Sequence, residues 1–285
     1  MINRLLDFIP ELQISEVTEA VTNWLTDTFS FIFDPINEHF GNFMEFMAEE
    51  VLMSVPPIIF IILIALLAFF VSGKRWGLAV FSIVGLWLIY NQGHWDDLMN
   101  TVTLVLLASL LSIIIGVPIG ILMAKSNTAN AVIKPILDFM QTMPAFVYLI
   151  PAVAFFGIGM VPGVFASLIF ATPPTVRFTN LGIRQVPREL VEASDAFGST
   201  GTQKLFKVEI PMAKSTIMAG INQTVMLALS MVVIASMIGA PGLGREVLSS
   251  LQRAQVGTGF VAGLGIVILA IIVDRLTQNI NRKKN

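Results

Sequence analysis

The chain has 285 residues, of which 55% are hydrophobic and 13% are charged, and its mean hydropathy is +0.80. Soluble domains carry about 25% charged residues, so this composition excludes a soluble globular domain and predicts a protein that crosses a membrane several times. The formal net charge is −2, and the absence of cysteine from the sequence excludes disulfides, thiolate metal sites and cysteine nucleophiles.

The first 54 residues form an acidic region with ten acidic residues and one basic residue, Arg4. Residues 1–20 lack a basic start and an apolar core, so we expect no cleavable signal peptide. Apolar side chains recur here at helical spacing, at Ile36, Phe40, Phe43, Met44, Met47 and Val51. We expect an amphipathic N-terminal helix outside the cell, lying along the membrane surface or against the first span. It is either a scaffold or docking collar, or a passive leader.

Seven apolar segments approach the length needed to cross a bilayer, which is about 20 helical residues. They are residues 56–71, 76–90, 98–124, 143–160, 163–176, 215–238 and 257–273. The fifth segment is short and contains Pro173-Pro174, so we expect a break at the prolines and a stop at Arg177. This pattern predicts two accessory spans in residues 55–96, a core in residues 97–277 and a basic cytoplasmic tail in residues 278–285.

A polar loop separates the fifth and sixth segments and reads PRELVEASDAFGSTGTQKLFKVEIP. Pro187 suits the first position of a helix, and Gly198 suits the left-handed residue just past a helix end. Thr200 or Thr202 can cap a second short helix, and Pro211 predicts the break that ends it. We therefore expect two short helices joined by a glycine turn, a shape that fits a groove on another protein.

This loop resembles the signature E-A-A-x3-G-x9-I-x-L-P of bacterial ABC-importer permeases. The signature positions are filled by Glu192, Ala193, Ser194, Gly198, Val208, Ile210 and Pro211. The resemblance implies an all-α polytopic membrane protein with the type I ABC importer fold. In that family the loop is a coupling helix that seats in a cleft of a cytoplasmic ATPase subunit. The alternative is an ordinary amphipathic loop.

The distribution of basic residues predicts the orientation. With the loop in the cytoplasm, alternation of the seven spans puts 14 of the 17 basic residues on the inner side. Arg4, Arg245 and Arg253 remain outside, which agrees with the positive-inside bias of membrane proteins. We therefore expect a multi-pass protein of the bacterial cell membrane with its N-terminus outside and its C-terminus in the cytoplasm.

A second resemblance covers the chain from about Asn100 to its end. Three stretches, QTMPAFVYLIPAVAFFGIG (141–159), FATPPTVRFTNLGIRQVP (170–187) and SMIGAPGLG (236–244), are similar to permeases for quaternary-amine osmolytes, namely glycine betaine, proline betaine, carnitine and choline. The resemblance implies a homodimer of permease chains, two copies of an ATPase that binds ATP and Mg, and a separate extracytoplasmic substrate-binding protein. It implies no cofactor, metal or nucleic acid on this chain.

Neutral polar and aromatic residues, with one methionine, in or beside the spans are the expected lining of a translocation path. They are Gln141, Phe146, Tyr148, Thr172, Gln223, Ser230 and Met237. The last three are seven residues apart, nearly two helical turns each, so they share one face. Aromatic faces attract a quaternary ammonium group with about 0.5–2 kcal/mol. The alternative for the polar residues is hydrogen bonding between helices, and for the aromatic residues it is ordinary packing.

The sequence offers no catalytic machinery. The stretch GSTGTQK (198–204) lacks the G-K-[ST] ending of a phosphate loop, and His39 and His94 are isolated. Ion-coupled carriers place carboxylates or histidines inside the bilayer, whereas Asp138 and Asp274 fall near inner span ends. We therefore expect a non-catalytic subunit driven by a partner ATPase. Two alternatives stay open: an ABC permease for another solute such as methionine, and a secondary carrier.

Overall fold

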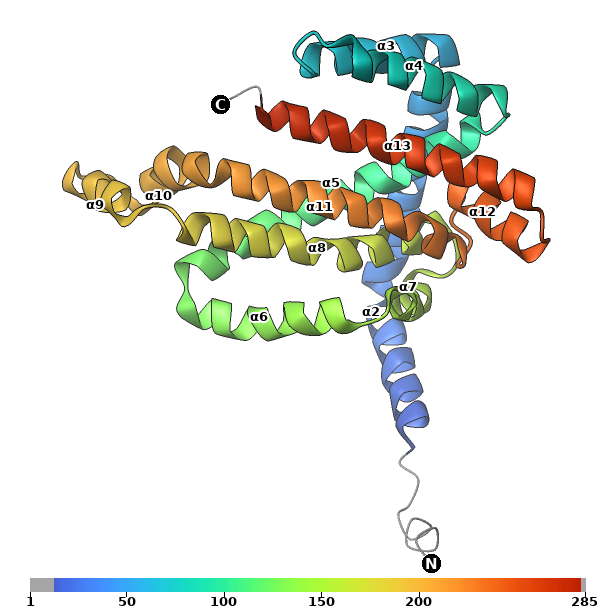
Figure 1. The fold of residues 1–285 in the computed structure, drawn as a ribbon. Helices are drawn as coiled ribbons and strands as arrows, with labels where there is room; N and C mark the ends of the chain where they lie inside the picture. The colour runs from blue at the N-terminus through green and yellow to red at the C-terminus, as the bar shows by residue number, and fades with distance from the viewer. Residues whose placement is uncertain (1–12, 283–285) are drawn as a thin grey trace, which may run out of the picture.

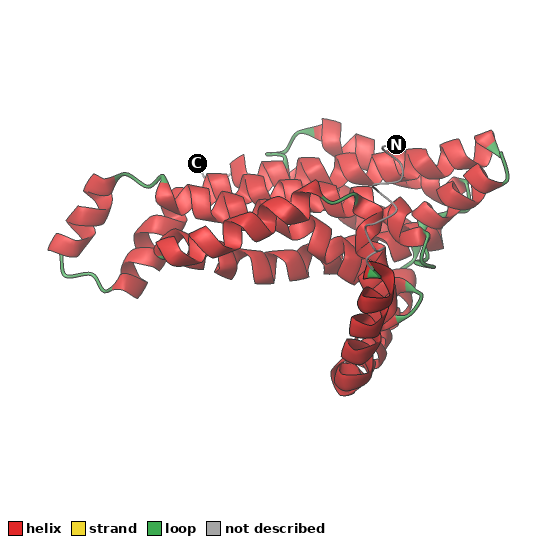
Figure 2. Ribbon diagram, turned by 90° about the horizontal axis from the view of Figure 1, so that it is seen from below, coloured by secondary structure: helices red, strands yellow, loops and turns green. Residues whose placement is uncertain are grey.

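A computed structural model describes the backbone of residues 13–282, and within this range the chain consists of helices and loops (Figure 2). Three features discussed above lie outside the described residues: Arg4, most of residues 1–20, for which no signal peptide is expected, and residues 283–285 of the predicted basic tail. The helical elements in chain order are α2 (Ile14–Glu45), η1 (Phe46–Met53), α3 (Pro57–Val71), α4 (Trp76–Asn91), α5 (Trp95–Lys125), α6 (Asn127–Thr142), η2 (Ala145–Tyr148), α7 (Leu149–Phe156), α8 (Met160–Arg184), α9 (Arg188–Ala196), α10 (Gly201–Lys204), η3 (Leu205–Glu209), α11 (Ile210–Ser236), α12 (Leu243–Gln252) and α13 (Val256–Arg282).

The long helices α5, α8, α11 and α13 lie side by side and form the centre of a bundle (Figure 1). Glycines bring the backbones of α5, α8 and α11 close together. A Cβ atom built on Gly120 would lie 2.6 Å from the carbonyl oxygen of Val176, and one on Gly220 would lie 2.5 Å from the Cβ of Phe178. Small residues at helix contacts are typical of membrane bundles, where close van der Waals packing replaces the hydrophobic drive between helices.

The predicted break at Pro173-Pro174 is wrong, because α8 continues through both prolines to Arg184. Prolines cannot donate to the preceding turn, and the carbonyls around them therefore need other partners. The neighbouring helices supply hydroxyls to this part of α8: Ser112 donates to the carbonyl of Leu168 at 3.2 Å, and Thr224 donates to that of Ala171 at 2.8 Å. The carbonyls that lose a helical donor to the prolines are those of Ile169 and Phe170, so these hydroxyls tie α8 to α5 and α11 but do not replace the missing bonds. The helix also continues past Arg177, where the span was expected to stop, and the guanidinium of Arg177 pairs with Asp138 of α6 at 2.5 Å.

The fourth predicted span, residues 143–160, does not form one helix. The straight helix in this part of the chain is α6, and a bend of 111° separates it from α7. The bend occurs at Met143, whose ψ of 134° is extended because the following Pro144 disfavours the helical conformation. As a result α6 runs beside the bundle, and α7 turns across one end of it (Figure 1).

The predicted break at Pro211 is wrong as well, since α10, η3 and α11 form one helical stretch over Gly201–Ser236. A π-helical turn precedes the proline, and the N–H of Ile210 there donates five residues back, to Leu205. A π-turn of this kind changes the register of backbone hydrogen bonds and so lets a helix continue next to a residue that lacks an N–H. The loop is therefore joined rigidly to the sixth predicted span.

The N-terminal helix α2 crosses the bundle transversely, and a bend of 91° separates α2 and η1 from α3 (Figure 1). Of its predicted apolar stripe, Met44 is buried, Phe40 and Met47 are half-buried, and Ile36, Phe43 and Val51 are exposed. Phe33 stacks on Phe155 of α7 with ring centroids 4.8 Å apart. The helix therefore packs against α7 and α8 of the core.

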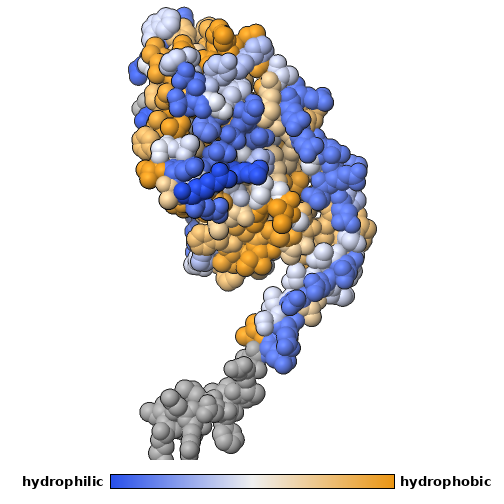
Figure 3. All heavy atoms as spheres, turned by 90° about the vertical axis from the view of Figure 1, so that its right-hand side faces the viewer, coloured by the Kyte–Doolittle hydropathy of each residue, from blue (hydrophilic) through white to orange (hydrophobic). Residues whose placement is uncertain are grey.

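The two ends of the bundle differ. The α3–α4 turn, the α5–α6 corner, the α9–α10 loop and the end of α13 lie at one end, while α2, α7 and α12 lie at the other (Figure 1). Hydrophilic side chains gather across the second end, with hydrophobic ones on the flanks (Figure 3). Three helical stretches are each long and apolar enough to cross a membrane, and five if each bent pair is one span, in the described part of the chain. The count of seven spans stays a prediction.

Candidate coupling loop and translocation face

The loop between α8 and α11 projects from one end of the bundle as two short helices, α9 and α10 (Figures 1 and 2). Gly198 joins them with a φ of 74°, and its N–H donates to the carbonyl of Asp195 at 2.9 Å. The space around its Cα is open, so a side chain here would be opposed by the backbone conformation and not by a neighbour. The glycine turn expected from the sequence is confirmed.

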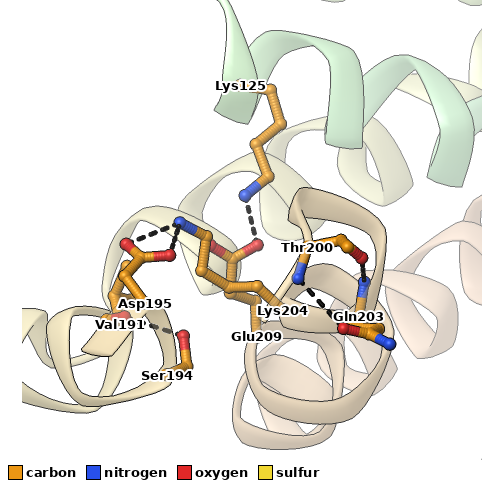
Figure 4. A network of polar contacts seen from close by, with 8 residues as sticks. All are labelled: Lys125, Val191, Ser194, Asp195, Thr200, Gln203, Lys204 and Glu209. Carbon is orange, nitrogen blue, oxygen red and sulfur yellow. Dashed lines mark hydrogen bonds and ion pairs between the residues drawn. The ribbon is translucent and has the colours of Figure 1, made fainter. Parts of the chain in front are cut away.

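Thr200 caps the second helix. Its hydroxyl accepts from the N–H of Gln203 at 3.3 Å, and the side-chain oxygen of Gln203 accepts from the N–H of Thr200 at 3.0 Å (Figure 4). This reciprocal capping box satisfies two N–H groups that have no partner inside the helix. Of the two threonines that the sequence left open, Thr200 is therefore the cap.

Two ion pairs, which the sequence analysis did not find, hold the loop in shape (Figure 4). The ammonium group of Lys204 lies 2.8 Å and 2.9 Å from the two carboxylate oxygens of Asp195, which ties α10 to α9. The ammonium group of Lys125, at the end of α5, donates to the carboxylate of Glu209. Glu209 is buried. The sequence feature that could have predicted this burial is its position as a single acidic residue between the apolar Val208 and Ile210.

The signature residues divide into two groups. Glu192, Ala193, Gly198 and Pro211 are exposed. Ser194 is buried with its hydroxyl donating to the carbonyl of Val191 at 2.7 Å, and Val208 and Ile210 are half-buried at the base of the loop. The first group is available to a partner, and the second group packs the loop against its own chain.

Large apolar side chains remain exposed on the same loop. Phe197 is 90% exposed, Phe206 is 61% exposed and Leu190 is 41% exposed. Apolar side chains clustered on a protruding polar loop mark a surface that another protein covers. The arrangement can therefore act as a knob, with a stiff base and an apolar tip.

The residues expected to line a path also divide. Gln141, Phe146, Gln223, Ser230 and Met237 are exposed, and the last three follow one face of α11 as the spacing predicts. This face is uncovered in the single chain.

Tyr148 and Thr172 are instead buried within the chain. The hydroxyl of Tyr148 donates to the carbonyl of Met140, and that of Thr172 donates to the carbonyl of Leu168 at 2.6 Å. Tyr148 thus joins η2 to α6, as in the packing alternative, whereas the hydrogen bond of Thr172 stays within α8.

Comparison with known proteins agrees with this architecture. Residues 116–285 match the family of binding-protein-dependent transport system inner membrane components. The chain is 59% identical to the glycine betaine/carnitine transport permease protein GbuB of Listeria monocytogenes, over 96% of this chain and 98% of the relative. It is 50% identical to the glycine betaine transport system permease protein OpuAB of Bacillus subtilis, over 98% of each chain.

Solved structures of the MetNI methionine ABC transporter in inward-facing conformations share the fold. One of its chains superposes with a TM-score of 0.60 at 21% identity, covering 70% of this chain and 97% of that chain. The family match and the close relatives together establish that the chain belongs to the binding-protein-dependent transport system inner membrane components, the membrane permeases of ABC importers.

Proposed function

We propose that this chain forms the translocation path of an ATP-driven importer for glycine betaine or a related quaternary amine, such as carnitine, proline betaine or choline. The observation that carries the proposal is the 59% identity, over 98% of its length, to a permease named for glycine betaine and carnitine. A third relative, 49% identical, is named for glycine betaine and proline betaine. The named solutes share a fully substituted, positively charged nitrogen.

The solute crosses between two copies of this chain, along the face of α11 that carries Gln223, Ser230 and Met237. The exposure of these residues in the single chain supports this role. A betaine has no net charge, so the path needs no buried counter-ion. An exposed aromatic ring such as Phe146, which is 57% exposed, attracts the ammonium group by cation–π interaction.

The α9–α10 loop couples the path to a cytoplasmic ATPase, of which the complex holds two copies that bind ATP and Mg. The exposed tip with Phe197 and the ion pair of Lys204 with Asp195, which ties α10 to α9, support a docking role. The loop lies at the cytoplasmic end, which puts α2 and the N-terminus outside, where a separate substrate-binding protein delivers the solute. The basic residues predicted to be cytoplasmic support this orientation.

Reconstitution tests the function directly. Vesicles containing the chain, its ATPase and its binding protein should accumulate labelled glycine betaine when ATP is enclosed, and excess carnitine or proline betaine should compete. Methionine in the same excess serves as the control and should not compete. Uptake that persists without the ATPase would indicate a secondary carrier. Competition by methionine but not by betaines would indicate an importer for another solute.

A further inference from the structure

The ion pair between Lys125 and Glu209 joins two distant parts of the chain. Lys125 is the last residue of α5, and Glu209 is the last residue of η3, 84 positions later. The Glu209 side chain is 7% exposed and that of Lys125 is 38% exposed. Removing a carboxylate from water is costly unless it is paired, so this contact is a fixed connection between the loop base and the end of α5.

The two ion pairs of the loop lie in series (Figure 4). Asp195 at the end of α9 holds Lys204 at the end of α10. The backbone then continues helically through η3 to Glu209, and Glu209 holds Lys125. A displacement of the exposed loop tip therefore also moves the end of α5, through the ion pair. It moves α8 and α11 through the backbone, because the loop is covalently continuous with both helices.

Helix α6 begins directly after the end of α5. The hydroxyl of Ser126, the next residue, accepts from the N–H of Ala129 at 3.2 Å and caps α6. In the described chain, Leu137 is the single buried residue of α6. Ile133 and Met140 are half-buried in the same apolar cluster as Leu137. Three further connections to α8 are polar: Arg177 with Asp138, Asn180 with Asn130 at 3.1 Å, and Arg184 with Asn127 at 3.1 Å.

The contrast with the neighbouring helices is clear. The α5–α8 and α8–α11 contacts are made by glycines with no space for an added carbon atom, so these helices move together. A helix held by one buried side chain, two half-buried ones and exchangeable polar contacts can change its position at lower cost than helices in glycine contact. It carries Gln141 of the proposed path and leads into Phe146.

We propose that the Lys125–Glu209 ion pair transmits movement of the α9–α10 loop to the α5–α6 corner and thereby sets the position of α6 beside the translocation path. The inference rests on the proposed docking of the ATPase on this loop. Lys125 and Glu209 are positioning residues: neither belongs to the proposed path or to the exposed tip of the loop, and they act through α6.

Neutral variants test the proposal in the reconstituted complex. In Lys125→Met and Glu209→Gln, ATP hydrolysis stimulated by the binding protein should be retained, while the amount of solute taken up per ATP should fall about fivefold or more, the size of a typical coupling between sites. Lys125→Arg and the exchange Lys125→Glu with Glu209→Lys should restore the ratio. Lys134→Met is the matched control, because Lys134 is an exposed lysine of α6 without an ion pair in the described chain.

A distance measurement separates transmission from a merely structural role. The chain has no cysteine, so spin labels can be placed at exposed sites, Val132→Cys on α6 and, in a second protein, Ser215→Cys on α11. In the parent complex, ATP should change the distance between the two copies for both labels. In Lys125→Met it should still change for the α11 label and no longer change for the α6 label.

The outcomes distinguish this proposal from the function on which it rests. An unchanged ratio of uptake to ATP in Lys125→Met, or an α6 distance change equal to that of the parent, would overturn the transmission through the ion pair while leaving the importer intact. A proportional loss of both activities together with poor assembly would assign the pair to stability alone and also overturn it. Absence of ATP-dependent uptake in the parent would instead refute the proposed function.

Discussion

The contact between α5 and α8 yields a prediction whose size follows from the structure. In Gly120→Ala, the new Cβ would lie 2.6 Å from the carbonyl oxygen of Val176 and 2.6 Å from the Cβ of Thr179. Ordinary contacts begin at 3.4 Å, so each atom is 0.8 Å too close. A backbone oxygen inside α8 cannot move aside by a rotamer change, and the two helices must therefore separate.

The cost of this separation exceeds the gain from a better helix former. Overpacking of a tight core costs about 1–3 kcal/mol, whereas replacing glycine by alanine inside a helix gains about 0.5–1 kcal/mol. We expect a net loss on the order of 1 kcal/mol, which corresponds to roughly 2–4 °C of unfolding temperature in proteins of about this size. The assay is the apparent unfolding temperature of the purified protein in detergent, measured at one heating rate because membrane proteins often unfold irreversibly.

Gly263→Ala in α13 is the matched control, since a Cβ atom there has no other atom within 4 Å. This variant should unfold at the same temperature as the parent or slightly higher, because it gains helix propensity without a clash. Gly120→Ala with an unfolding temperature at or above that of the parent would refute the reasoning. The same result would show that the α5–α8 contact is looser than these distances imply.

Three further predictions concern the loop, the orientation and the path. Gly198→Val should insert into the membrane normally but lose ATPase association and uptake, because a β-branched residue is strained at a φ of 74° by roughly 1 kcal/mol or more; normal uptake would contradict this. Ala20→Cys should react with an impermeant thiol reagent in intact cells, whereas Thr202→Cys should react only after the membrane is opened, and labelling of position 202 from outside would reverse the orientation. Ser230→Trp should block uptake and leave assembly with the ATPase intact, while loss of assembly would show that this face packs against protein and does not line a cavity.

Features that depend on a few neighbouring residues could be predicted from the sequence. The positive φ at Gly198 follows from local backbone chemistry and is observed, and of the two candidate caps, Thr200 and Thr202, the structure selects Thr200. The bend between α6 and α7 was also available locally, since Met143 precedes a proline, but the continuous apolar run obscured it. The shared exposed face of Gln223, Ser230 and Met237 follows from helical periodicity alone.

The continuity of α8 and the mechanics of the loop were decided by tertiary structure. Pro173 and Pro174 predict a helix break, but α8 continues through them, in a part of the helix where Ser112 and Thr224 of adjacent helices donate to the nearby carbonyls of Leu168 and Ala171. The partner of Glu209 is 84 residues away, so no local pattern could identify it.

Composition, periodicity and a spaced signature thus determined the membrane class, the family and the two-helix loop. Each of these depends only on the residue types present and on their spacing over short stretches of sequence. The course of α8, the position of α6 and the connection of the loop to α5 depend on which distant groups meet. The hydrogen-bond partner of a buried polar group is decided by how the helices pack, and this packing is present only in the folded chain.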